Sequence, residues 1–254
     1  MSYGTLNISS INGSGLENNY FINPEFTINQ RGAATPTTTA NAYNYDRWYY
    51  DGTYLYQGIE NNNLRNTTYT ISWTGSATAS YSLNTASSSS QSGQTYTSIT
   101  SGSNITISSL GSNTLWIRFS AQPTQPKLEL GSAQTTFVPR LYGQELALCQ
   151  RYYQLIGQGF TGSVEGTTSI SINEKFLVQM RASPSTSIVS GQNCSIRYLG
   201  GDVTNSSPTL TAPSSNINGL WTLVNGFTTL TTNTPVQSRN NTSNTLFISV
   251  SAEL

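Results

Sequence analysis

The sequence has no histidine, only two cysteines and few charged residues. Lys and Arg together number 11, as do Asp and Glu, so 9% of the 254 residues are charged and the formal net charge is zero. An ordinary globular domain has about a quarter of its residues charged. No charged residue lies between Arg65 and Arg118, or between Asp202 and Arg239. The chain is therefore neutral, and long stretches of it are free of charge.

These absences exclude several kinds of function. Without histidine the chain has no Ser-His-Asp or Cys-His catalysis and no imidazole metal ligand. Sparse Lys and Arg argue against nucleic-acid binding, because that affinity comes from neutralising phosphates. No run approaches the roughly 18 apolar residues of a membrane span, and Met1 to Gly15 lacks the pattern of a secretory signal. We expect no catalytic residue, metal or cofactor, and no membrane insertion.

The two cysteines, Cys149 and Cys194, fit no metal-ligand spacing. One disulfide between them is an alternative. Two buried free thiols is the interpretation we favour, because disulfides are rare in proteins assembled in a cytosol.

Small polar residues dominate what remains, since Ser, Thr and Asn make up about two residues in five. Such a composition raises the alternative of disorder, which usually comes with high net charge and few aromatic residues. Here aromatic residues are 11% and the net charge is zero. We therefore expect a folded chain.

Alternation of large apolar residues with period two recurs along the chain and predicts strands. In the first half the alternating residues are Tyr69, Ile71 and Trp73; Ile105 and Ile107; and Leu115, Ile117 and Phe119. In the second half they are Ile170 and Ile172; Phe176, Val178 and Met180; Cys194, Ile196 and Tyr198; and Leu246, Ile248 and Val250. Many short strands separated by turn residues are typical of all-β sandwiches.

One segment has helical spacing instead. Leu146, Cys149 and Tyr153 predict a single short helix over 143–155. We therefore predict an all-β chain of two successive antiparallel, jelly-roll-like β-sandwich domains, at 20–142 and 156–254, joined by that helix. Residues 1–19 are either a disordered tail or an arm that attaches to a neighbouring subunit, and residues 84–104 are a loop or a weak edge hairpin.

Aromatic residues gather between positions 43 and 56. Flat aromatic rings near Asp and Arg side chains suit a sugar-binding surface, and the candidate glycan-binding residues are Tyr45, Trp48, Tyr50, Tyr54 and Tyr56. The competing interpretation, which we favour, places one aromatic face in the core and the other at a subunit contact.

Five charged residues are interpreted as structural. Asp46 and Arg47 form a charge pair at the entry of a strand. Glu129 lies in an apolar strand and needs a cationic partner, which we expect to be Arg140 or Arg151. A glycosidase pair of carboxylates, Glu25 with Asp46 or Asp46 with Asp51, is the weaker alternative, since spacing favours neither.

Several of these residues belong to segments that resemble a known kind of protein. Residues 23–32 (NPEFTINQRG) and 45–48 (YDRW) resemble the start of a β-sandwich module of tailed-bacteriophage virion proteins. Residues 127–131 (KLELG), 137–140 (FVPR) and 145–153 (ELALCQRYY) are similar to the end of that module and its exit helix. Residues 176–184 (FLVQMRASP) and 251–254 (SAEL) look like the small β domain that often follows it.

The resemblance implies a fold and a function. Such proteins are tail fibre, tail spike or capsid decoration proteins, and the first module looks like a jelly-roll carbohydrate-binding module. We expect a structural virion protein, assembled in the host cytoplasm as a homotrimer, that contacts other virion proteins and presents a surface for a host glycan. The alternatives are a capsid decoration protein or head fibre, which copy number per particle would distinguish, and a polysaccharide depolymerase.

Overall fold

The computed structural model describes residues 19–157, 159–239 and 248–254. In these ranges the chain forms antiparallel sheets with one α-helix, α1 (Tyr142–Gln150), which confirms the predicted all-β, sandwich-like fold. The chain divides into two compact units within α1: the first runs to Leu146 and includes Leu254, and the second spans Ala147–Glu253. The predicted N-terminal arm, apart from Asn19, lies outside the described residues.

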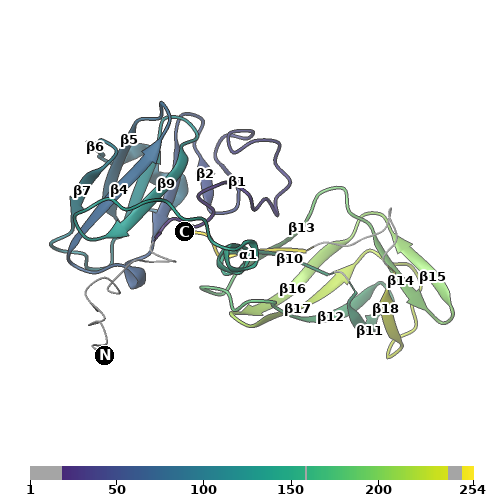
Figure 1. Ribbon diagram of the computed structural model, residues 1–254. Helices are drawn as coiled ribbons and strands as arrows, with labels where there is room; N and C mark the ends of the chain where they lie inside the picture. Colours follow the sequence, from purple (N-terminus) through teal and green to yellow (C-terminus); the bar gives the residue numbers. More distant parts are fainter. Residues whose placement is uncertain (1–18, 158, 240–247) are drawn as a thin grey trace, which may run out of the picture. The chain divides into compact units, whose positions relative to one another are not determined.

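The first unit contains two sheets (Figure 1). The six-stranded sheet has the order β1 (Ala42–Tyr45), β2 (Trp48–Tyr50), β3 (Leu55–Ile59), β8 (Thr114–Phe119), β5 (Ala79–Asn84) and β6 (Thr97–Ile99). The three-stranded sheet has the order β7 (Ser103–Thr106), β4 (Thr68–Thr74) and β9 (Thr124–Leu130). Two short 3-10 helices, η2 (Asn61–Asn63) and η3 (Ser88–Gly93), lie in the connections.

Both sheets contribute to one core, as in a sandwich. The buried residues of the six-stranded sheet include Trp48, Leu55, Leu115, Ile117 and Phe119, and those of the three-stranded sheet include Tyr69, Ile71, Ile105 and Leu128. The alternating residues of β4 and β8 therefore lie on the predicted face. Segment 84–104 supplies η3 and the edge strand β6, in agreement with the prediction of a loop or weak edge hairpin.

The second unit also has two sheets. The larger has the order β15 (Gly201–Asn205), β14 (Cys194–Tyr198), β18 (Pro235–Ser238), β11 (Thr161–Gly166), β12 (Ser169–Lys175), β17 (Gly219–Asn225) and β16 (Thr209–Asn216). The smaller has the order β10 (Tyr153–Ile156), β19 (Ile248–Ser251) and β13 (Ser185–Ile188). Their shared core includes Ile170, Ile172, Ile196, Ile248 and Val250, which confirms three predicted strands; Leu246 lies outside the described residues.

Two predicted elements are corrected. The helix ends at Gln150 rather than at 155, because Tyr153 to Ile156 pair with β19. The predicted strand from Phe176 to Met180 does not form. The Gln154 side chain accepts from Leu177 N and donates to Val178 O at 3.0 and 2.6 Å, while Phe176 N and Met180 N donate to the backbone oxygens of Asn218 and Ile217.

The cysteines are as predicted. Cys149 and Cys194 are free thiols, and both are buried. Burial raises the pKa of the Cys194 thiol to about 12. In the ranges that the structure describes, no helix has the length and apolar character needed to cross a membrane.

Candidate functional site: a groove beside Arg118

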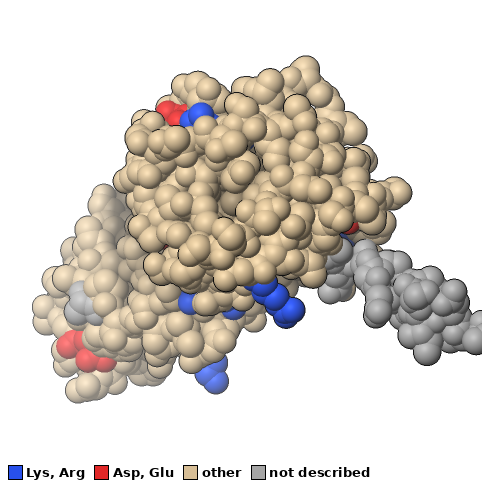
Figure 2. All heavy atoms as spheres, turned by 90° about the vertical axis from the view of Figure 1, so that its left-hand side faces the viewer, with Lys and Arg blue, Asp and Glu red and all other residues tan. Residues whose placement is uncertain are grey.

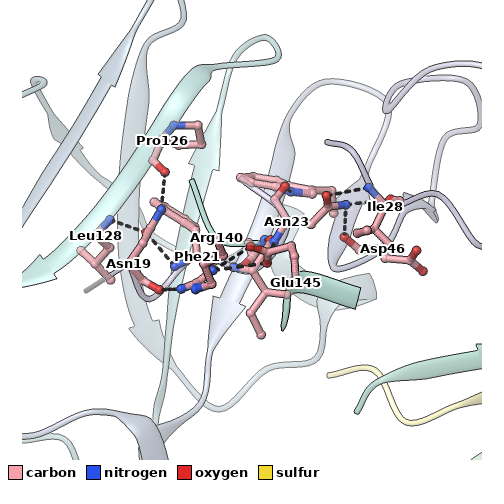
Figure 3. A network of polar contacts seen from close by, with 12 residues as sticks. Asn19, Phe21, Asn23, Ile28, Asp46, Pro126, Leu128, Arg140 and Glu145 are labelled. Atoms are coloured by element: carbon pink, nitrogen blue, oxygen red, sulfur yellow. Dashed lines mark hydrogen bonds and ion pairs between the residues drawn. The ribbon is translucent and has the colours of Figure 1, made fainter. Parts of the chain in front are cut away.

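Asn23, Arg140 and Glu145, from segments that carry the sequence resemblance, meet in a buried polar network (Figure 3). Arg140 donates to Phe21 O at 3.0 Å and to Asn19 O, and pairs with Glu145 at 3.0 Å. Glu145 also accepts from Asn23 N at 2.5 Å. The Arg140 and Glu145 side chains are only 9% and 6% exposed. The network fixes an irregular N-terminal segment to the sandwich, which is a structural role.

Asn23 and its neighbours extend this network. The Asn23 side chain donates to Ile28 O and accepts from Ile28 N, at 2.8 and 3.0 Å, and closes the loop between them. The Trp48 indole N–H donates to Asn23 O at 2.8 Å. Asp46 is fully buried, accepts from Gln30 N at 2.8 Å and lies 3.8 Å from the Arg31 guanidinium. Arg47 is also buried and donates to Gly58 O at 2.8 Å.

Glu129 has a different partner from the one expected. Its carboxylate pairs with Lys127 Nζ at 2.9 Å and accepts from the backbone and hydroxyl of Thr135. Both charged side chains are at most 5% exposed. The expectation that Arg140 or Arg151 pairs with Glu129 is wrong, because alternate residues of one strand project to the same face and bring Lys127 alongside. Arg140 instead forms an ion pair with Glu145.

The five aromatic residues predicted to bind a glycan lie in two different environments. Trp48 is fully buried and packs on Phe26 with ring centroids 4.7 Å apart. Tyr45 and Tyr50 are partly buried against the same core. Tyr54 and Tyr56 belong to a separate aromatic cluster on the other face of the six-stranded sheet, with Tyr49, Tyr96 and Trp116.

The strand register aligns a row of side chains on that second face. Tyr56 on β3 and Ser80 on β5 are both opposite Arg118 on β8. Tyr49 on β2 continues the row on one side and Ser98 on β6 continues it on the other. Cross-strand neighbours lie about 5 Å apart, so this row brings aromatic, cationic and hydroxyl groups together.

Arg118 is held in this row by aromatic contacts. Its Cζ lies 4.2 Å from the ring centroid of Tyr54 and 3.9 Å from that of Tyr96. Its Nε donates to Ser80 Oγ at 2.8 Å. Cation–π contacts favour a charged guanidinium at the ring face. These contacts orient the side chain without an acidic partner from the part of the chain that the structure describes.

The tyrosine hydroxyls nearby stay protonated. Burial and the hydrogen bond that Tyr56 donates to Asp51, at 2.6 Å, raise the pKa of Tyr56 well above its usual range. Burial also raises the pKa of Tyr96, against the opposing effect of Arg118. Both rings therefore remain neutral hydrogen-bonding groups at physiological pH.

Arg118 and Tyr54 border a surface groove with a volume of about 740 Å³. Arg118 is the charged residue of its lining, and most of the others carry a hydroxyl group. The lining residues are Tyr54, Thr78, Ala79, Ser80, Tyr81, Thr97, Ser98, Ile99, Thr100, Ser103, Asn104 and Arg118. Charged side chains are sparse on the face of the molecule drawn in Figure 2 as well.

Sequence reasoning missed Arg118, Ser80 and Tyr96. One signal was present, since Arg118 is the only charged residue between Arg65 and Lys127. It also occupies the outward position between Ile117 and Phe119, both of which are buried. A lone charge on the outer face of a predicted strand points to the site, but the residues opposite it depend on register.

The three carboxylates considered as a glycosidase pair, Glu25, Asp46 and Asp51, either accept structural hydrogen bonds or lie exposed. Asp46 is buried in the network described above. Asp51 accepts from Thr53 N and Tyr54 N, both at 2.7 Å, and from the Tyr56 hydroxyl. Glu25 is exposed. Among the residues that the structure describes, no three His, Cys, Asp or Glu side chains are grouped to hold a metal ion.

Comparison with protein-family models, with curated proteins and with solved structures found no match.

Proposed function

We propose that this protein is a non-enzymatic adhesion subunit that binds a glycan in the groove beside Arg118. The observation that carries the proposal is the lining itself: hydroxyl groups and a side-chain amide surround partly exposed tyrosine rings. Sugars offer hydroxyl groups for hydrogen bonds and C–H faces for aromatic rings. A lining of this kind matches both.

The groove differs from the pockets that enclose small apolar ligands. Such pockets are mostly hydrophobic with a few polar groups. Here Thr97, Ser98, Thr100 and Asn104 are exposed, and they lie along the edge strand β6 and the start of β7. An open polar surface of this volume suits a short stretch of a saccharide chain.

The setting we propose is the virion of a tailed bacteriophage, as a homotrimeric tail fibre or spike that also contacts other virion proteins. The sequence resemblance and the charge-poor composition support this setting. Val138, Leu141 and Tyr142 of the first unit are 44%, 74% and 64% exposed, and apolar residues of this kind are available for contacts between copies.

A glycan array tests the proposed function. The wild-type chain is expected to bind a subset of the saccharides, and Ser98→Trp is expected to abolish binding because the indole fills the groove. Ser132→Trp is the matched control: Ser132 is exposed in the same unit and does not line the groove. Wild-type binding to no saccharide, or binding that survives Ser98→Trp, would contradict the proposal.

A further inference from the structure

The charge of the groove narrows the class of sugar that fits it. Arg118 is the one charged residue of the lining. It forms no ion pair with any residue in the described ranges, whereas Arg140, Arg197 and Arg239 each do. The groove therefore holds a cation that pairs directly with no carboxylate in residues 19–157, 159–239 and 248–254.

The guanidinium is also oriented before any ligand arrives. Its contacts are the ring faces of Tyr54 and Tyr96, at 4.2 and 3.9 Å, the Ser80 hydroxyl and the neighbouring Tyr56 hydroxyl. Ring faces bind the flat side of a guanidinium and do not occupy the N–H groups along its edge. The Nε–H already donates to Ser80 Oγ, and the remaining N–H groups form a planar fork that matches the two oxygens of a carboxylate.

Asp51, the acidic residue linked to Arg118 through Tyr56, already accepts several hydrogen bonds. Asp51 accepts hydrogen bonds from two backbone N–H groups and from the Tyr56 hydroxyl. The Tyr56 hydroxyl in turn lies beside Arg118. Asp51 thus orients Tyr56 and does not close an ion pair with the guanidinium.

We infer that the groove binds an acidic saccharide, with a sugar carboxylate paired to the edge of the Arg118 guanidinium. The inference rests on the proposed glycan-binding function and adds the chemical class of the ligand. Hydroxyl groups of β5 and β6 then contact the neutral sugar units on either side. Charge-assisted hydrogen bonds are about twice as strong as neutral ones, so the carboxylate contributes strongly to affinity and selectivity.

The test uses the full chain and an array with four arms: uronic-acid saccharides, sialylated saccharides, sulfated saccharides and neutral saccharides. For each carboxylated saccharide that binds, a second sample has its carboxyl groups reduced to alcohols. We expect binding to carboxylated saccharides, and a loss of about tenfold or more in affinity on reduction or in Arg118→Gln. Arg65→Gln, at an exposed arginine of the same unit, is expected to leave binding unchanged.

Arg118→Lys keeps the positive charge and removes the planar guanidinium. It also serves as a second variant in case Arg118→Gln fails to fold. We expect it to fold with a wild-type circular dichroism spectrum and to bind more weakly than wild type, because an ammonium group cannot form the bidentate pair. Equal binding of native and carboxyl-reduced saccharides would overturn this inference and leave the glycan-binding function standing, as would a preference for the sulfated arm. Binding to no saccharide at all would contradict the glycan-binding function itself.

Discussion

At the scale of single residues, the distinctive side chains of the sequence divide into structural and surface groups. Asn23, Asp46 and Glu145 are buried and hydrogen-bonded, and the Arg140 side chain that pairs with Glu145 is 9% exposed. These residues have a structural role, because each supplies a hydrogen bond or an opposite charge to a polar group that is itself buried. Arg118, by contrast, faces a groove. Rarity in the sequence therefore did not by itself separate structural residues from candidate binding residues, whereas burial did.

Arg140→Ala is predicted to destabilise the first unit by about 3–5 kcal/mol, since it leaves the buried Glu145 carboxylate without its cation. Urea unfolding followed by tryptophan fluorescence measures the change. The matched control is Arg65→Ala, which removes an exposed arginine from the same unit. A midpoint for Arg140→Ala equal to that of the control would show that the network contributes little to stability.

Gly58→Ala is predicted to destabilise the first unit by about 1–3 kcal/mol through overpacking. An added Cβ would lie 2.9 Å from Leu254 Cδ1 and 3.0 Å from both Thr114 Cγ2 and Trp116 Cη2. Gly93→Ala is the control, because a Cβ there meets nothing within 4 Å. Thermal unfolding checks both variants, and a wild-type melting temperature for Gly58→Ala would argue against this close packing.

At the scale of elements, alternation predicted strands best where the backbone of neighbouring strands supplies the hydrogen bonds of the segment. The alternating residues of β4, β8 and β12 are buried as expected, as are Cys194 and Ile196 of β14, whereas Tyr198 is only partly buried. The pattern from Phe176 to Met180 also alternates, yet its middle backbone groups bond to the Gln154 side chain and no strand ladder forms. Periodicity predicts which side chains are buried, but it does not predict which groups form hydrogen bonds with the backbone.

The same limit applies to the helix and to the candidate site. Leu146, Cys149 and Tyr153 have helical spacing, but pairing with β19 takes Tyr153 into β10. Tyr54 and Tyr56 were identified from their aromatic character, whereas Ser80, Tyr96 and Arg118 join them only through strand register and a long connection. Contacts between residues distant in the chain carry little signal in a single sequence.

Gln154→Ala is predicted to destabilise the second unit by about 1–3 kcal/mol, because Leu177 N and Val178 O lose their buried partner. Hydrogen exchange at Leu177 should accelerate before the rest of the unit is affected. Gln179→Ala is the control, since Gln179 is exposed and its amide donates to the exposed side chain of Asn218. Equal exchange at Leu177 in both variants would rule out the proposed role of Gln154.

At the scale of the whole molecule, the shortage of charge has a consequence for assembly. Identical neutral subunits do not repel one another, and apolar and hydrogen-bonded contacts lose little when salt screens charge. We predict a trimer, with a mass of about three times 27.5 kDa, at both low and high salt. Light scattering at micromolar concentration measures it, and a monomer of 27.5 kDa would contradict the proposed trimer.

The thiols offer a test of the fold as a whole. Both are buried, and the pKa of Cys194, at about 12, keeps that thiol protonated at pH 8. A thiol-specific reagent is predicted to label neither cysteine in the native chain and both in denaturant without reductant. Rapid labelling of the native chain would contradict the burial, and no labelling in denaturant would indicate a disulfide.

Hydrogen exchange of the full chain, with and without a saccharide that the array identifies, tests whether the groove beside Arg118 binds a glycan as proposed. We expect added protection in peptides covering Thr78 to Tyr81 and Thr97 to Asn104, which supply most of the groove's lining. Peptides from β11 to β18 of the second unit serve as the internal reference and should not change. Protection confined to the second unit, or no change in either groove segment, would contradict the groove as the binding site.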